Sequence, residues 1–184
     1  DLDICVACPM YHMEYSADGV HLTAESSHFL GRYYANAIAR SAFHETWVPT
    51  SPKRVLWTGR IIDIEFHVPA GALTVDTNLV TETHNYGFDL WRGNSQIDAA
   101  LASVTLKQGN RIIITLSDDP QVGDLLTYAR GRVGDPIASG PQTGPRGNVR
   151  DQNGDTDFFT GRDGKLYRLH NWLVAFQYQY SPTS

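Results

Sequence analysis

The sequence has few cysteines, no long hydrophobic run and no excess of positive charge. Its 184 residues include 2 cysteines, too few for a disulfide framework. No apolar run approaches the roughly 20 residues that a membrane-spanning helix needs. The 15 Lys and Arg are outnumbered by 20 Asp and Glu, which gives a formal net charge of −5. General nucleic-acid binding needs a basic footprint. We therefore expect neither a membrane span nor a nucleic-acid partner.

The chain also lacks an initiator Met and the charged and apolar regions of a signal peptide, since it begins at Asp1. We expect a processed or excised part of a longer protein, with any missing catalytic group located upstream. Cys5 and Cys8 have C-x-x-C spacing, but a redox pair normally opens a helix. Residues 4–8 instead predict a short buried strand that ends at Pro9. No second cysteine pair completes a zinc site, so we expect no metal and no cofactor.

A helix is predicted to begin at Thr23. Threonine is a good N-cap, and the carboxylate of Glu25 suits the first turn of a helix. An apolar stripe then recurs at intervals of four residues: Phe29, Leu30, Tyr33, Tyr34, Ala37 and Ile38. Strand, loop and helix form half of an α/β unit, which cannot bury its own faces. Residues 1–47 should therefore belong to a larger layered domain and pack on other structure.

The remaining residues predict an all-β domain. Pro49 and Pro52 mark residues 48–54 as a linker. From 55 to 184, short apolar runs separated by Gly, Asn, Asp or Pro favour an antiparallel β-sandwich. The expected strands are 60–68, 73–75, 86–91, 102–106, 111–116, 125–129 and 172–180. Residues 107–110 predict a hairpin turn, and 131–164 a long loop. The fold class is therefore α+β overall.

Asp18 and His21 form the most suggestive polar pair in the sequence. They lie three residues apart just before the helix, and the turn at Gly19 would let both face one cleft. In a catalytic Asp–His pair, the carboxylate orients the imidazole and stabilises the imidazolium that forms when histidine takes a proton. The D-x-x-H pattern is short, however, and both side chains can equally cap backbone amides at a helix entry. The four residues alone leave both interpretations open.

The surroundings of this pair resemble the C-terminal block of SGNH (GDSL-type) hydrolases. The matching segments are 4–11 (ICVACPMY), 16–25 (SADGVHLTAE) and 31–35 (GRYYA). The resemblance covers residues 1 to about 44. It implies the closing strand, loop and helix of a flavodoxin-like domain, in which Asp18 and His21 match the family's catalytic Asp and His.

The chain departs from this family because it lacks the G-D-S nucleophile and the G-x-N-D block. Gly-Asp occurs only at 123–124, 134–135 and 154–155, and the last, followed by Thr156, lies in a polar loop. In the family both blocks come earlier in the chain. The resemblance therefore implies that a preceding N-terminal part of the same protein supplies the serine. An Asp–His pair without a nucleophile has nothing to activate, so this chain alone should be inactive.

Residues 55–184 resemble the Ig-like sandwich appended to some SGNH carbohydrate esterases of bacteria and phages. The strings that carry this resemblance are 85–88 (NYGF), 147–151 (GNVRD) and 170–176 (HNWLVAF). It implies an acylated oligosaccharide or polysaccharide as substrate, O-deacetylation as the reaction, and an extracellular or virion location. The alternative is a non-catalytic glycan-binding or structural module, for example in a phage tailspike.

Aromatic side chains are candidates for stacking on sugar rings, although core packing is their commoner use. The candidates in the sandwich are Trp57, Trp91, Tyr128, Tyr167 and Trp172. Trp172 lies in an apolar run and is predicted to be core. Trp91 precedes Arg92 at a turn, and it is the better candidate for an exposed, substrate-binding ring.

Two further patterns could suggest metal binding. Asp151, Asn153, Asp155 and Asp157 alternate as in a calcium loop, but the Gly and Glu of an EF-hand are replaced by Thr156 and Arg162. A turn-forming role is favoured, and a bound cation stays open. Six other histidines show no ligand spacing, and we interpret them as surface or hydrogen-bonded residues: His12, His28, His44, His67, His84 and His170.

Overall fold

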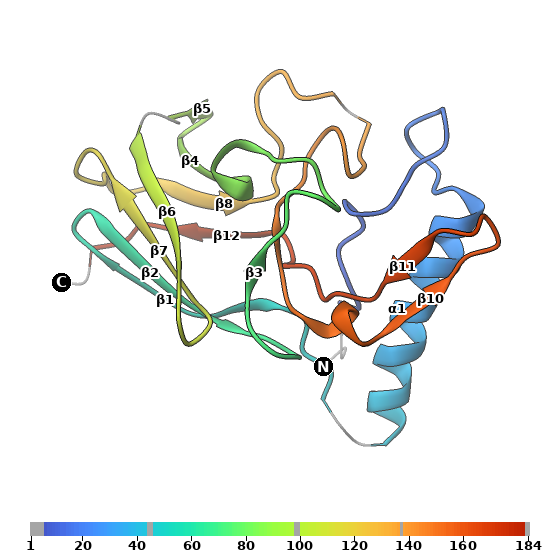
Figure 1. Cartoon of the computed structure of the whole chain (residues 1–184). Coiled ribbons are helices and arrows are strands. Elements are labelled where there is room, and N and C mark those ends of the chain that lie inside the picture. Colours follow the sequence, from blue (N-terminus) through green and yellow to red (C-terminus); the bar gives the residue numbers. More distant parts are fainter. Residues whose placement is uncertain (1–5, 44–45, 98–99, 137, 183–184) are drawn as a thin grey trace.

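The structure is a computed structural model that describes residues 6–43, 46–97, 100–136 and 138–182. In these residues it is mostly antiparallel β-sheet with one α-helix (Figure 1), which is compatible with the α+β class. The elements are α1 (Ala24–Ala42), β1 (Ser51–Thr58), β2 (Ile61–His67), β3 (Thr74–Val75), η1 (His84–Gly87), β4 (Phe88–Arg92), β5 (Ser95–Gln96), β6 (Leu101–Lys107), β7 (Arg111–Leu116), β8 (Leu125–Tyr128), β9 (Val149–Arg150), η3 (Asn153–Asp155), β10 (Phe158–Thr160), β11 (Leu166–Arg168) and β12 (Phe176–Gln179).

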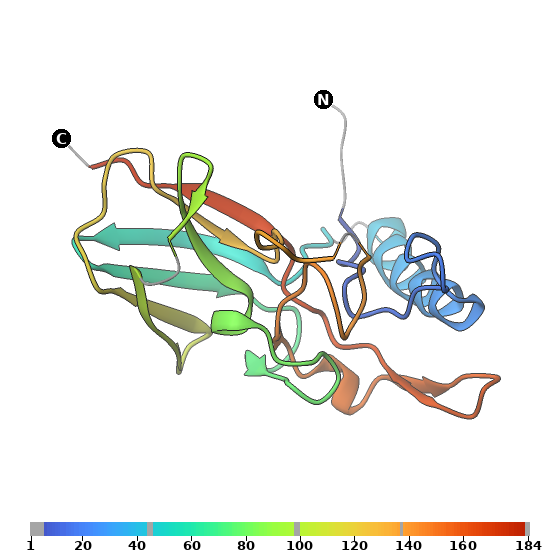
Figure 2. The same ribbon diagram turned by 90° about the horizontal axis from the view of Figure 1, so that it is seen from above.

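Two four-stranded antiparallel sheets form the larger part of the molecule (Figure 2). Their strand orders are β1-β2-β7-β6 and β12-β8-β4-β5. Along β2 and β7 buried residues alternate with more exposed ones, which is the pattern of strands with one face on a core. The two sheets share one apolar core, to which they contribute Ile62, Ile64, Phe66, Ile112, Ile114, Leu116, Phe88, Leu90, Leu126 and Tyr128.

The predicted strands with clear alternation are confirmed. β2, β6, β7 and β8 lie where the sequence places strands, to within two residues at each end. The turn between β6 and β7 is also confirmed, with Gly109 and Asn110 both in the left-handed region at φ 74° and 58°. Glycine and asparagine tolerate this backbone conformation, and so the short turn forms at this place.

Several other predictions need correction. β1 begins at Ser51, inside the segment 48–54 that the sequence suggests as a linker. Only Phe176–Gln179 of the predicted strand 172–180 forms a regular strand, β12. Of the predicted strand 4–8, Ile4 and Cys5 lie outside the described residues. Residues 6–8 are not in a strand, and Val6 is 49 % exposed. No strand in the described ranges pairs with this segment.

The helix α1 begins as the sequence predicts. The Thr23 Oγ1 accepts a hydrogen bond from the main-chain N–H of Ser26 at 3.2 Å, and Glu25 occupies the first turn. Phe29, Tyr33 and Ala37 are buried. The face containing Phe29 and Tyr33 packs against the hairpin β10–β11 and neighbouring residues, including Met13, Leu169, Phe159 and Tyr167. This hairpin replaces part of the long loop expected at 131–164.

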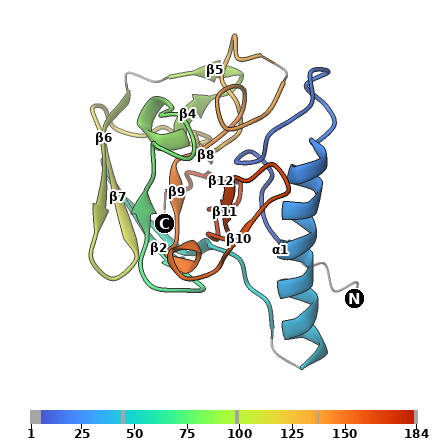
Figure 3. The ribbon, with the colours of Figure 1, turned by 45° about the vertical axis from the view of Figure 1, so that its right-hand side comes forward.

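The other side of α1 does not pack on the described residues. Tyr34 is 51 % exposed and Ile38 is 67 % exposed. Figure 3 shows α1 at the edge of the molecule, with one side turned away from the sheets. The apolar stripe predicted as a single buried surface is therefore divided into a buried face and an exposed face.

Two tyrosines join the N-terminal segment to the sheets. The Tyr11 hydroxyl donates a hydrogen bond to the main-chain oxygen of Leu173 at 2.8 Å, and its ring belongs to the core shared by the sheets. The Tyr33 hydroxyl donates to the main-chain oxygen of His170 at 2.6 Å. Tyr11 also meets Trp172 edge to face, with ring centroids 6.0 Å apart. The segment before residue 48 thus contributes to the same packed body as the sheets.

Buried polar side chains hold together the three strings noted in residues 85–88, 147–151 and 170–176. The Asn148 Nδ2 donates to the main-chain oxygens of Asp76 (3.1 Å) and Val80 (2.8 Å). The main-chain N–H of Asn148 donates to the carbonyl of Tyr86 at 3.0 Å. Asp151 accepts the Asn171 Nδ2 at 2.7 Å. These residues satisfy the backbone of adjoining loops, which is a structural role.

Candidate functional site

Asp18 and His21 are brought into direct contact. The Nδ1 of His21 lies 2.6 Å from the Oδ2 of Asp18. The Oδ1 of Asp18 accepts the main-chain N–H groups of Val20 (3.0 Å) and His21 (3.1 Å). The hydrogen bond from the His21 ring, followed by these two main-chain bonds, lowers the pKa of Asp18 well below its usual range. The carboxylate is therefore ionised and accepts a hydrogen bond from the Nδ1–H of the imidazole, whose neutral tautomer carries its lone pair on Nε2.

A short loop fixes this pair. Tyr15 and Leu22 form an antiparallel bridge, and the main-chain N–H of Ser16 donates to the carbonyl of His21 at 2.7 Å. Gly19 lies between the two catalytic candidates with a φ of 69°. A Cβ at this position would also lie 2.7 Å from the Cβ of Ala138. Glycine therefore suits both the turn and the close approach of the neighbouring loop.

The pair faces solvent. The side chains of His21 and Asp18 are 79 % and 50 % exposed. Within the described ranges no residue makes a hydrogen bond with the Nε2 of His21. The arrangement can orient an imidazole as a general base, but the nucleophile that it would activate is not among the contacts of the pair.

The expectation that Trp91 is exposed is wrong. Its side chain is 7 % exposed, and the guanidinium of Arg130 covers the ring, with Cζ 4.5 Å from the centroid. A turn follows Trp91 in sequence, but the tryptophan itself lies in β4, which is buried along most of its length. Trp172 is 2 % exposed and is core, as predicted, and Tyr128 is fully buried.

The segment 151–157 folds as a turn around η3. The carboxylate of Asp151 is fully buried and accepts main-chain N–H groups of Ala70, Asn153 and Asn171. The Oδ2 of Asp157 accepts the Asn153 Nδ2 at 3.1 Å. These bonds occupy both carboxylate oxygens of Asp151 and one of Asp157. In the part of the chain that the structure describes, no group of three or more His, Cys, Asp or Glu is arranged to hold a metal.

His44 lies outside the described residues. Of the five other histidines that the structure describes, two are neither exposed nor fully hydrogen-bonded. Both ring nitrogens of His12 are buried and have no hydrogen-bond partner in the described residues. The same is true of the Nε2 of His170. The Nδ1 of His170 accepts hydrogen bonds from the N–H of Gly154 and from Arg150. Sequence reasoning missed His12. The available signal was its position between the large apolar residues Tyr11 and Met13.

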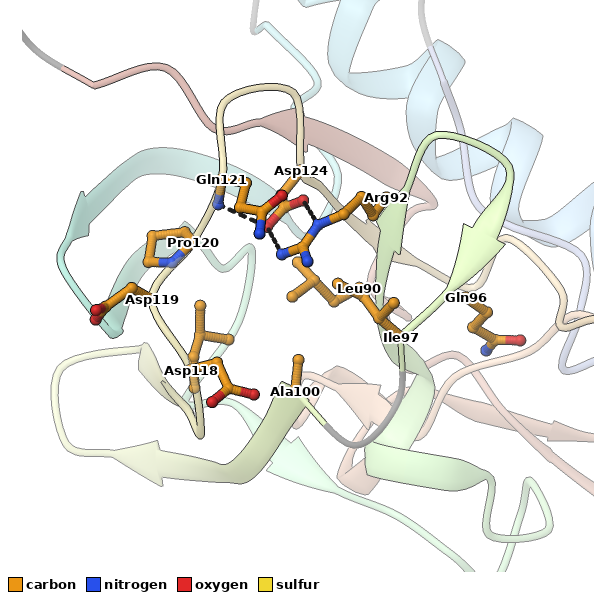
Figure 4. A pocket seen from close by; sticks show the side chains of 11 residues that line it. Leu90, Arg92, Gln96, Ile97, Ala100, Asp118, Asp119, Pro120, Gln121 and Asp124 are labelled. Atoms are coloured by element: carbon orange, nitrogen blue, oxygen red, sulfur yellow. Dashed lines mark hydrogen bonds and ion pairs between the residues drawn. The ribbon is translucent and has the colours of Figure 1, made fainter.

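A cavity of about 510 Å³ opens at the end of the sheets opposite α1 (Figure 4). Leu90 and Ile97 contribute to its apolar wall. Two of its charged side chains neutralise one another, because Arg92 donates two hydrogen bonds of 2.8 and 2.9 Å to Asp124. The N–H of Gln121 completes the contacts of this carboxylate at 2.9 Å. The arrangement fastens the loop after β7 to the end of β4.

Comparisons with known proteins find a distant structural similarity but no match in sequence. No family model and no curated protein sequence matches the chain. A carbohydrate acetylesterase from Xanthomonas citri has a similar structure, with 17 % sequence identity and a TM-score of 0.50 over 86 % of this chain. The chain spans 29 % of that enzyme's length. The N-terminal part of the bacterial S-layer protein SbsC matches 88 % of this chain and 30 % of its own chain, with 12 % identity and a TM-score of 0.35, too low to support an argument.

The acetylesterase comparison supports a distant, esterase-like fold. It does not by itself transfer an activity, because fold and chemistry are separate properties. Among the helices that the structure describes, none has the length and apolarity to cross a membrane.

Proposed function

We propose that the chain is the C-terminal portion of an SGNH-type esterase that removes acyl groups, most simply acetyl, from a carbohydrate. The observation that carries the proposal is the contact of 2.6 Å between the His21 Nδ1 and the Asp18 Oδ2, with the Nε2 directed to solvent. The fold similarity to a carbohydrate acetylesterase supports the same class of reaction. The resemblance of the sequence around this pair to the SGNH hydrolases supports their family and roles.

In this proposal a preceding part of the same protein supplies a serine. The His21 Nε2 takes the serine proton while the serine oxygen bonds to the acyl carbon. His21 then gives that proton to the sugar oxygen as the ester bond breaks. Water repeats the cycle, releases the acid and regenerates the serine. Asp18 holds the imidazole and stabilises its charged form.

The exposed face of α1 supports the existence of this further part. Tyr34 and Ile38 lie on one side of the helix and are 51 % and 67 % exposed. An apolar helix face is normally buried against another element. The chain spans 29 % of the similar acetylesterase, so we propose that the preceding, serine-bearing part of the protein covers this face.

The sheets complete the proposal as an Ig-like accessory sandwich that assists substrate binding. The substrate is an acylated oligosaccharide or polysaccharide, and the location is extracellular or on a virion. The assignment of residues 1–47 to the catalytic domain and 55–184 to the accessory domain belongs to the same proposal.

Replacement of His21 by Ala tests the mechanism. In the full-length protein, acetate release from an acetylated glycan should fall about a thousandfold or more, because the general base is lost. Asp18→Asn should reduce the rate less if another acceptor holds the ring. His84→Ala, at an exposed histidine of η1, is the matched control and should keep the parent rate. Near-normal turnover of His21→Ala would favour the alternative, a non-catalytic glycan-binding or structural module such as a phage tailspike end.

A further inference from the structure

A second cavity lies close to the loop that carries Asp18 and His21. Its volume is about 160 Å³. It lies between residues 12–14, the first turns of α1, the loop at 141–142 and the hairpin β10–β11. The main-chain N–H of Glu14, at its edge, donates to the Ser26 Oγ at 2.9 Å, and the carbonyl of Glu14 accepts the N–H of Thr23 at 3.1 Å. The same short segment therefore shapes both the cavity and the Asp18–His21 loop.

His12 lines this cavity and lacks the partners that its nitrogens require. The ring is stacked on Trp172 at a centroid distance of 5.5 Å and meets Phe29 and Tyr33 edge to face. Both nitrogens are buried without a hydrogen-bond partner in the described residues. A buried polar atom without a hydrogen-bond partner is destabilising, so such atoms are uncommon in folded proteins. The imidazole borders the cavity.

The protonation state of His12 restricts the ligand. Burial and, to a smaller extent, the nearby His170 together lower the pKa of His12 to about 3. The ring is therefore neutral near pH 7, with one nitrogen that donates and one that accepts. A hydroxyl group has the same two capacities. An anion could use only the donor, and an apolar group could use neither.

The mouth of the cavity presents both apolar and polar groups. Leu79 and Leu166 are 44 % and 47 % exposed there. Gln142 adds an amide, while Lys165 and Glu14 form an ion pair of 3.4 Å. Arg168 also lines the cavity, and its guanidinium donates a hydrogen bond to the main-chain oxygen of Gly154 at 3.0 Å. A pyranose ring has apolar C–H faces and a rim of hydroxyls, which fits this mixture of groups.

We propose that this cavity binds one uncharged pyranose unit, with a sugar hydroxyl hydrogen-bonded to His12. The inference rests on the proposed function in taking a carbohydrate as the substrate, and it adds a binding position beside the catalytic loop. The bound unit would hold the glycan while its acyl group reaches His21.

Nuclear magnetic resonance of the 184-residue chain tests the cavity without any esterase activity. Methyl glucoside, methyl galactoside and methyl N-acetylglucosaminide are the probes, and cyclohexanol and glucuronate are the apolar and anionic comparisons. We expect at least one uncharged pyranoside to shift the His12 ring signals at millimolar concentration. His12→Phe keeps an aromatic ring at the site and should weaken binding about tenfold while leaving the melting temperature equal or higher. His84→Phe, at an exposed position, should change neither property.

Three results would overturn the proposed cavity site: no pyranoside shifts His12, His12→Phe binds as tightly as the parent, or cyclohexanol or glucuronate binds as well as the pyranosides. Any of them leaves the role of His21 untouched. Conversely, His21→Ala should still bind the pyranoside. Binding at the cavity and catalysis by His21 can therefore fail independently, the first in the His12 ring signals and the second in acetate release.

Discussion

At the scale of single residues, the buried histidines set the response of stability to acid. Burial lowers the pKa of His12 to about 3 and that of His170 to about 4, against 6.5 for an ordinary histidine. Below pH 6.5 the unfolded chain binds protons that the folded chain does not, so acid favours unfolding until the folded pKa values are reached. Above pH 6.5 the two histidines are neutral in both states and the protein keeps its full stability. The free energy of unfolding then decreases as the pH falls from 6.5 to about 3 to 4.

We therefore expect the free energy of unfolding to fall by about 2–4 kcal/mol between neutral pH and about pH 5, since each pH unit contributes up to ~1.4 kcal/mol per histidine. Urea denaturation at the two pH values measures it. His12→Phe should remove about half of the change. Carboxylates with lowered pKa values, such as Asp76 and Asp124, lose their contribution only at lower pH. Equal urea midpoints at both pH values would contradict this account.

The sequence predicts part of the candidate site for a physical reason. The side chains of Asp18, His21 and Thr23 form hydrogen bonds with residues at most three positions away, so spacing and turn chemistry are enough to place them. Trp91 and His12 could not be placed in this way. Their surroundings come from Arg130, Trp172 and Phe29, which are distant in the chain. Burial of that kind depends on tertiary packing.

At the scale of elements, the two faces of α1 should differ in their contribution to stability. Phe29 is 6 % exposed and packs on Phe159 and Tyr167. Phe29→Ala should lower the free energy of unfolding by about 3–5 kcal/mol. Ile38, 67 % exposed, is the matched position, and Ile38→Ala should change it by less than about 0.5 kcal/mol. Chemical denaturation of the 184-residue chain measures the free energy of unfolding of both variants. Similar decreases in the two would contradict the division of α1 into a buried and an exposed face.

Strands with alternating burial were predictable and the peripheral elements were not. β2 and β7 have a repeating apolar pattern because one face lies on the core and the other does not. β10 (FFT) and β11 (LYR) are three residues each, which is too short to show an alternating pattern. Their pairing is stabilised by contact with α1, which lies more than a hundred residues earlier in the chain. No local pattern contains that information.

At the scale of the whole molecule, residues before 48 should stabilise the sheets. A chain shortened to begin at Trp47 loses the Tyr11 ring and the whole of α1. Trp172 and Leu169, which are 2 % and 5 % exposed, would then contact water. We expect β-type circular dichroism to persist. The melting temperature should fall by much more than in Tyr11→Phe, which removes only the hydroxyl's two hydrogen bonds, to Leu173 and Tyr128, each contributing about 1 kcal/mol. A shortened chain that melts with the parent would indicate two independent units.

The way in which the Asp18–His21 loop is built also has a consequence for sequence variation. Two of the three donors to Asp18 are main-chain N–H groups, which every residue except proline possesses. The side chain of Val20 is 69 % exposed and takes no part in these bonds. Gly19, in contrast, is restricted by its backbone angle and by Ala138. Natural variants of this loop should therefore tolerate many residues at position 20 and very few at 18, 19 and 21, so that D-G-x-H is the pattern by which other chains with this loop can be found.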